Sequence, residues 1–124
     1  MGAVKITYGK PSAGYQRGKV TVSRHQEAVI FSCEEEYPEE LVQRKEKTAA
    51  LIGELQKVIE AQGGLVGHIK AYLEESGCSV SLSGTGGPVT EQETFCRKVK
   101  LYFTAIAFVV EEEEICEFLN RKLE

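Results

Sequence analysis

Apolar and polar residues alternate along three stretches of the chain, with the period of two that marks a strand with one buried face. The stretches are residues 4–8, 19–24 and 97–110, and the last is the strongest. It exceeds the usual length of a strand, so we expect a bulge or a long ribbon that reaches past the body of the domain. Residues 27–33 are apolar in succession at positions 28–31, which predicts an inner strand with cover on both faces.

The stretch 63–89 predicts a further hairpin with a tight turn at positions 76–77. In that register Leu73 faces Val80 and Tyr72 faces Ser81, so apolar and polar residues are sorted across both strands. A short helix over residues 65–76 is the alternative, because its apolar residues also recur at helical spacing and Gly77 suits a C-terminal cap. The cross-strand sorting favours the hairpin. A glycine-rich loop at 84–88 follows, and residues 90–94 then lead to the last strand.

Two stretches carry apolar residues at the spacing of an amphipathic helix. The first should begin near Pro38 and end at Gly63, with residues 43–47 as a solvated section. The acidic run 34–40 resembles a cation-binding cluster, but carboxylates at the positive end of a helix dipole explain it better. The second helix should open in the acidic run 111–114. The predicted apolar stripes are Leu41, Val42, Leu51, Ile52, Leu55, Val58 and Ile59 in the first helix and Ile115, Phe118, Leu119 and Leu123 in the second.

Six strands and two helices are therefore expected within a single α+β domain, residues 1–124. Residues 9–14, which include two glycines and a proline, should form a loop that extends to Gly18. The economical packing is a two-layer sandwich, in which a mainly antiparallel sheet carries both amphipathic helices on one face. A ferredoxin-like or related fold has this architecture. An apolar fraction of 42% and a charged fraction of 27% suit a globular domain of this kind.

Charge and cysteine spacing narrow the classes of function. A net charge of −4 opposes nucleic-acid binding, which needs clustered Lys and Arg. The chain contains no apolar run long enough to span a membrane and no apolar signal region near residue 1, so we expect a soluble, cytoplasmic protein without membrane partners. The cysteines lack the spacing of metal ligands, so free thiols are expected, with no metal and no cofactor. They are Cys33, Cys78, Cys96 and Cys116.

The predicted hairpin and its loop form a candidate site for an anion or small ligand. A lysine supplies a point charge, hydroxyls and an imidazole supply hydrogen-bond donors, and a glycine-rich turn can aim backbone N–H groups at a phosphate or carboxylate. The loop lacks the spacing of a P-loop or a dinucleotide fold, so no nucleotide class follows. A solvated outer sheet face is the simpler interpretation of the same residues. They are His68, Lys70, Tyr72, Ser81, Ser83, Thr85 and Gly86.

Two functions of different classes fit these patterns. The first is a homo-oligomeric binding or interaction module, expected to be a homodimer because the apolar end of the last strand, at Ile106, Phe108 and Val110, is costly to leave in water. The alternative is a small enzyme in which His68 acts as general acid/base and Lys70 stabilises negative charge. An enzyme should enclose His68 in a concave site, whereas an interaction module should leave it on a flat or dimer-buried face.

Overall fold

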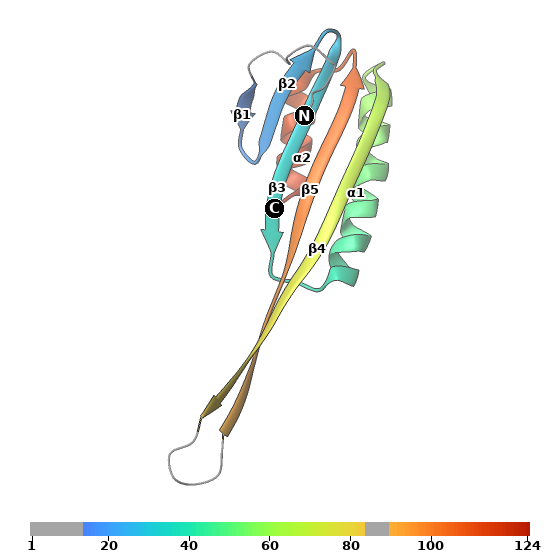
Figure 1. Ribbon diagram of the computed structural model, residues 1–124. Coiled ribbons are helices and arrows are strands. Elements are labelled where there is room, and N and C mark those ends of the chain that lie inside the picture. The colour runs from blue at the N-terminus through green and yellow to red at the C-terminus, as the bar shows by residue number, and fades with distance from the viewer. Residues whose placement is uncertain (1–13, 84–89) are drawn as a thin grey trace.

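A computed structural model describes residues 14–83 and 90–124, with the backbone alone over 76–83 and 90–97. These residues form one antiparallel sheet with the strand order β1-β2-β3-β5-β4, together with two helices (Figure 1). The predicted α+β class is confirmed. The elements in chain order are β1 (Tyr15–Arg17), β2 (Val20–His25), β3 (Ala28–Tyr37), α1 (Leu41–Ala61), β4 (Leu65–Ser83), β5 (Thr90–Phe108) and α2 (Glu112–Lys122).

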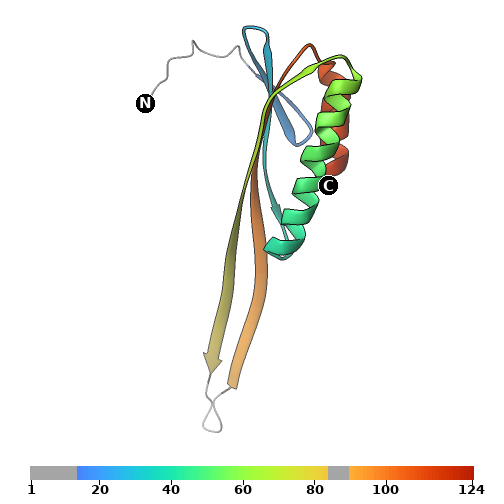
Figure 2. The same cartoon turned by 90° about the vertical axis from the view of Figure 1, so that its right-hand side faces the viewer.

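The sheet places β5 between β3 and β4, so the chain must cross from one side of β5 to the other before β5 is made. α1 provides that connection. Both helices lie on the same face of the sheet, as the edge-on view shows (Figure 2). The opposite face, which we call the outer face, has no helix over it among the described residues.

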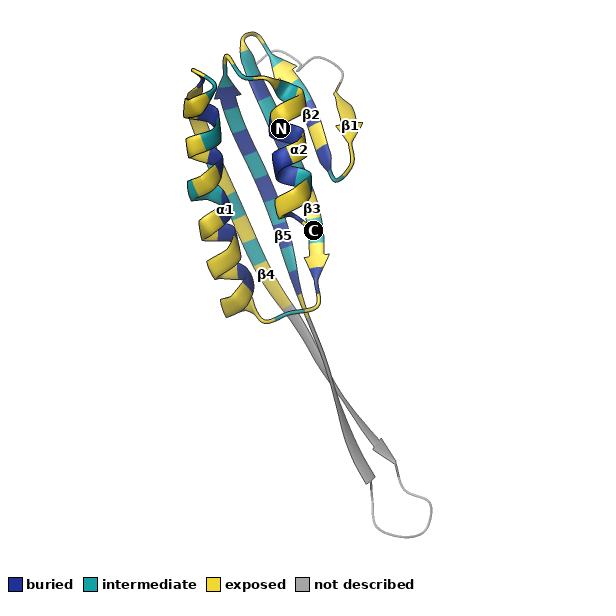
Figure 3. Ribbon diagram, turned by 180° about the vertical axis from the view of Figure 1, so that it is seen from behind, coloured by how far each residue is buried: buried dark blue, intermediate teal, exposed yellow. Residues whose placement is uncertain are grey.

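The core lies between the sheet and the two helices, and its residues follow the predicted periods. Buried and half-buried positions alternate along β5 (Figure 3), because successive side chains of a strand point to opposite faces. Each fully buried leucine or phenylalanine contributes about 1.5–3 kcal/mol through removal of apolar surface from water. Largest among the fully buried side chains are Phe31, Phe103, Leu55, Ile59, Leu101, Ile115, Leu119 and Leu123.

The two longest strands leave the body of the domain, as predicted for a long ribbon, but not where the sequence placed it: most of the predicted strand 97–110 lies in the body, and residues 90–98 extend past it. β3 pairs with β5 only as far as Tyr37 opposite Val99, whereas β4 pairs with β5 as far as Ser83 opposite Thr90. Within the described chain, residues 76–83 of β4 and 90–98 of β5 therefore pair only with each other. We call this two-stranded segment the β-ribbon. It projects well past the helices and the other strands (Figures 1 and 2).

The predicted turn at 76–77 is wrong, and so is the helical alternative for 65–76. β4 runs straight through these positions, and Leu73 lies opposite Leu101 of β5 instead of Val80. Gly77 sits at a register irregularity between Ser76 and Cys78, where a bulge replaces the turn. The stretch 90–94, predicted to lead into the last strand, is already part of β5.

α1 begins later than predicted, and its buried face is shifted. Residues 34–37 continue β3, so the acidic run is mostly strand, and Glu40 with Gln43 forms the capping box before Leu41. Leu41 and Val42 are consequently exposed, at 36% and 64%, while Arg44 is only 4% exposed. The predicted stripe is confirmed at Leu51, Leu55 and Ile59. The predicted solvated section therefore contains a buried arginine.

Three further predictions concern β1, α2 and β3. The loop does not extend to Gly18, because Tyr15–Arg17 forms the short edge strand β1. α2 follows the predicted acidic run and has glutamates in its first turn and Arg121 and Lys122 in its last, as the helix dipole favours. β3 is an inner strand, as predicted, but Ile30 on its outer face stays half-buried. The predicted strand 4–8 lies outside the described residues.

Candidate functional site

Three of the predicted site residues share the outer face of β4. His68, Lys70 and Tyr72 alternate along this edge strand and are all exposed. The strand reaches them through a bulge at Gly67, where the pairing with β5 shifts register. A side chain at Gly67 would place its Cβ 2.9 Å from the carbonyl oxygen of Ile106, so only glycine fits without a shift of backbone.

The structure gives these three residues different cross-strand partners from those predicted. His68 lies opposite Ile106, Lys70 opposite Thr104 and Tyr72 opposite Tyr102, all on β5. The rings of the two tyrosines are 5.9 Å apart, a distance at which tilted aromatic pairs stabilise. Between His68 and Tyr72, this part of the outer face therefore combines a lysine, an imidazole, a threonine and two phenols.

The predicted serines do not join this group. Ser81 and Ser83 lie farther along the same strand in the β-ribbon. At about 3.3 Å per residue, Ser81 is about 36 Å from Lys70 along the strand, too far for both to touch one small ligand. Thr85 and Gly86 lie outside the described residues. The ligand-binding role of His68, Lys70 and Tyr72 remains a prediction, now without its glycine-rich loop.

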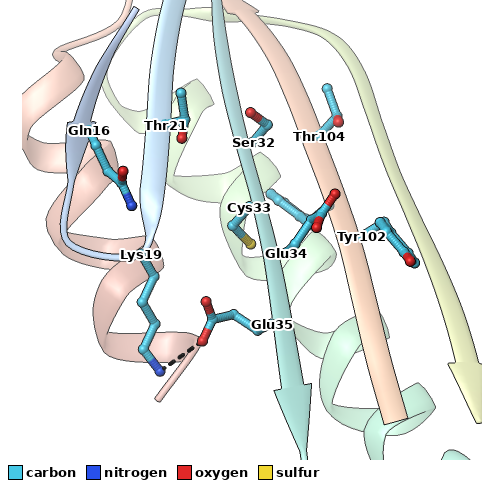
Figure 4. A pocket seen from close by; sticks show the side chains of 10 residues that line it. Gln16, Lys19, Thr21, Ser32, Cys33, Glu34, Glu35, Tyr102 and Thr104 are labelled. Carbon is cyan, nitrogen blue, oxygen red and sulfur yellow. Dashed lines mark ion pairs between the residues drawn. The ribbon is translucent and has the colours of Figure 1, made fainter. Parts of the chain in front are cut away.

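A hollow of about 460 Å³ opens beside these residues, on the other side of β5. It exists because β2 begins at Val20 while β3 continues to Tyr37, so the edge of β3 beyond Cys33 has no strand beside it. The hollow has a polar rim (Figure 4), and its lining residues are Gln16, Lys19, Thr21, Ser32, Cys33, Glu34, Glu35, Tyr102, Phe103 and Thr104.

The charges around this hollow are largely satisfied within the protein. Lys19 Nζ lies 3.4 Å from a carboxylate oxygen of Glu35 and donates a hydrogen bond to the carbonyl of Leu123 at 3.2 Å. Burial raises the pKa of the Cys33 thiol to about 11, which leaves it a poor nucleophile at neutral pH. The hollow can therefore accept a small polar molecule through hydroxyls, but it offers no activated nucleophile.

Sequence reasoning missed this hollow because it assigned residues 34 and 35 to the start of a helix. One signal was present: Ser32 and Glu34 alternate with the apolar Phe31 and Cys33, which continues the strand period past the predicted end at Cys33. The hollow itself follows from the unequal lengths of β2 and β3, which no local pattern specifies.

A second polar cluster, at the start of α1, is structural. The guanidinium carbon of Arg44 lies 3.3 Å from the centre of the Tyr37 ring, and the guanidinium pairs with Glu39. Tyr37 in turn donates a 2.7 Å hydrogen bond to the carbonyl of Leu123, and burial raises its pKa to about 12. The cluster joins the end of β3 to both helices.

Neither metal sites nor known relatives add to this description. Among the side chains that the structure describes, in residues 14–75 and 98–124, no three His, Cys, Asp or Glu gather as a metal site would require. Neither described helix is long and apolar enough to cross a membrane. The chain was compared with protein-family models, curated proteins and solved structures, and it matches none of them.

Proposed function

We propose that this protein is a homo-oligomeric interaction module that presents its β-ribbon to a protein partner. One observation carries the proposal: β4 and β5 stay paired from Ser76 opposite Lys98 to Ser83 opposite Thr90, although the remainder of the sheet ends at Val99. An isolated two-stranded hairpin is at best marginally stable in water. A ribbon of this length therefore has a use outside the core of its own domain.

The sequence of the β-ribbon favours a protein as its partner. By register, one set of alternate positions holds Cys78, Val80, Leu82 and Phe95 together with Glu91 and Glu93, while the other set holds serines, threonines and a glutamine. Apolar positions on a projecting ribbon gain stability when another chain removes them from water. The charged residues in 76–98 are Glu91, Glu93, Arg97 and Lys98, so the β-ribbon lacks the excess of positive charge that contact with a phosphate backbone needs.

The exposed position of His68 weighs against the enzyme alternative, because an acid/base group works best in an enclosed site. We retain a small anion bound at Lys70 as a second proposal. It is supported by Thr104, which lies opposite Lys70 on β5, and by the hydroxyls of Tyr72 and Tyr102, the next pair on the outer face. We also propose a cytoplasmic location, which the free thiols of Cys33 and Cys116 support.

The finer fold class belongs to the same proposal. The segment from β3 to α2 has the order strand, helix, strand, strand, helix, and its three strands lie side by side as β3-β5-β4. β2 then occupies the place beside β3 that a fourth strand takes in a ferredoxin-like sheet. These features support a two-layer sandwich related to that fold.

A photo-reactive amino acid tests the function of the β-ribbon. We would place it at Leu82 of the full chain and, as a matched control, at Gln56 on the exposed side of α1. Irradiation in cells that produce the protein should give one discrete protein adduct at position 82, and far less at 56. Equal adducts at both positions, or none at 82, would show that the β-ribbon does not contact a protein.

A further inference from the structure

The outer edge of β4 is open along residues 65–75. No strand lies beyond β4 in the described part of the sheet, and the view onto this edge shows nothing in front of it (Figure 2). An open edge presents unpaired backbone N–H and C=O groups, which favour pairing with another strand. Two exposed side chains mark the edge, Leu65 at 65% and Tyr72 at 57%.

We propose that two copies of this protein pair antiparallel through the outer edges of their β4 strands, with the twofold axis at Tyr72. This inference rests on the proposed homo-oligomeric state and identifies its interface. The two five-stranded sheets would then form one continuous sheet, with the helices of both copies on the same side. A twofold interface of this kind is self-complementary, so every contact occurs twice.

The charges of β4 fit this register. With Tyr72 on the axis, Lys70 lies opposite Glu74 of the partner subunit, and Glu74 lies opposite Lys70 of the partner subunit. Both pairs lie on the outer face, at directly opposed positions where unlike charges attract. An axis one residue away, at Ala71 or Leu73, would break both pairs.

The inner face of β4 is matched by the same register. Ala71 lies opposite Leu73 of the partner subunit on the side that the helices cover, while Ile69 lies opposite Glu75 of the partner subunit. A register in which outer positions face inner positions would expose this apolar set, which makes such registers unfavourable. The inner face therefore excludes the registers that mix the two faces, and the charge pairs of the outer face select Tyr72 as the axis.

The irregularities of β4 are placed symmetrically about the same residue. The pairing of β4 with β5 shifts once at Gly67 and once at Gly77, and both positions are equally distant from Tyr72. The regular stretch between them, from His68 to Ser76, is thus centred on the proposed axis. In the dimer, Gly67 lies opposite Gly77 of the partner subunit, so the two bends of the edge coincide.

The same register supports the base of each β-ribbon. Positions 76–79 of one copy lie beside residues 65–68 of the partner subunit, so the first part of the ribbon gains a third strand. Three strands with an apolar face are considerably more stable than two. The dimer therefore supports the base of a ribbon that begins without support from its own β3.

A charge-reversal series tests the interface in the full chain by sedimentation velocity over a range of concentrations. Lys70→Glu should weaken the dimer on the order of 10- to 30-fold, because it turns two attractive pairs into two repulsive ones. Adding Glu74→Lys should restore most of the affinity. The control Lys57→Glu changes the net charge equally on the exposed side of α1 and should leave the dimer unchanged.

A disulfide tests the position of the axis. Directly opposed residues in an antiparallel pair have Cα atoms about 4.5–5.5 Å apart, within the range that a disulfide bridges. In a background with Cys78→Ser and Cys96→Ser, Tyr72→Cys should form a covalent dimer on mild oxidation. His68→Cys should not, because its symmetry mate would lie about 26 Å away at about 3.3 Å per residue.

The outcomes separate this inference from the function of the β-ribbon. A chain that stays monomeric at high micromolar concentration overturns the dimer, and so does a dimer insensitive to Lys70→Glu. A loss that Glu74→Lys fails to restore, or a disulfide at position 68 in place of 72, overturns the register. None of these results changes the photo-adduct expected at Leu82, which reports the ribbon contact alone.

Discussion

Asn120 of α2 holds the turn between β1 and β2 against the helix, and its replacement gives a sharp prediction. The backbone N–H of Lys19 donates to Asn120 Oδ1 at 2.7 Å, and Asn120 Nδ2 donates to the carbonyls of Arg17 and Cys116, both at 2.9 Å. Two of these groups flank Gly18, whose φ of 63° suits glycine. A single side chain therefore satisfies both sides of the turn.

Asn120→Ala should lower the free energy of unfolding by about 2 kcal/mol. Three hydrogen bonds of about 1 kcal/mol each set the upper limit, and water replaces part of that at the exposed carbonyl of Arg17. For a domain of this size the melting temperature should fall by roughly 8 °C. Glu117→Ala, an exposed position on the same helix, is the matched control and should change stability by less than about 0.5 kcal/mol.

Urea unfolding combined with amide hydrogen exchange measures this effect. The amide of Lys19 should lose protection in Asn120→Ala, because its acceptor is gone, while amides in the centre of β3 should change only by the global loss of stability. A variant as stable as the parent, with an unchanged exchange rate at Lys19, would show that Asn120 does not hold the turn.

Two further predictions concern the buried Arg44 and the half-buried Glu112. Arg44→Ala should lower the free energy of unfolding, measured in urea, by about 3 kcal/mol, because it removes a partner of Glu39 and uncovers the Tyr37 ring. An Arg44→Ala protein as stable as the parent would refute this. Although desolvation raises the pKa of Glu112, hydrogen bonds from Tyr15 and Arg24 overcome it and hold that pKa below its ordinary value of 4.5. The stability it contributes should be present above pH 4.5 and lost as the pH falls through the lowered pKa, so the difference in stability between the parent and Glu112→Gln should shrink steadily as the pH is lowered below 4.5. A difference that does not change with pH below 4.5 would contradict the assignment.

Local patterns predicted the parts of the fold that depend only on a strand's or helix's own buried face. Alternation identified β2 and most of β5, and the acidic start and apolar stripe identified α2. The outer-face grouping of His68, Lys70 and Tyr72 was also predictable, because a period of two needs only the strand itself. These predictions required no knowledge of which strand pairs with which.

Local patterns could not predict which strands pair with each other, or which side of α1 is buried. Leu73 sorts equally well against Val80 or Leu101, and only the burial of β5 between two strands decides for Leu101. Likewise, Arg44 looks solvated among charged neighbours. Its burial follows from Tyr37, which ends β3 under the helix and provides the ring on which the guanidinium stacks.

The segment that sequence reasoning interpreted least well is also the one that we connect with function. Residues 76–83 and 90–97 show weak strand signals because Glu93 and Glu91 lie opposite Val80 and Leu82 and interrupt their apolar positions. Their pairing is nevertheless continuous, since β4 and β5 enter the ribbon already in register from a well-packed sheet. The paired strands of the body thus fix the register of the β-ribbon. Cys78, Val80, Leu82 and Phe95 are apolar positions in it that a second protein could bury. A projecting element that takes its register from its domain, and whose apolar positions have no cover of their own in the described chain, supports the proposed interaction module.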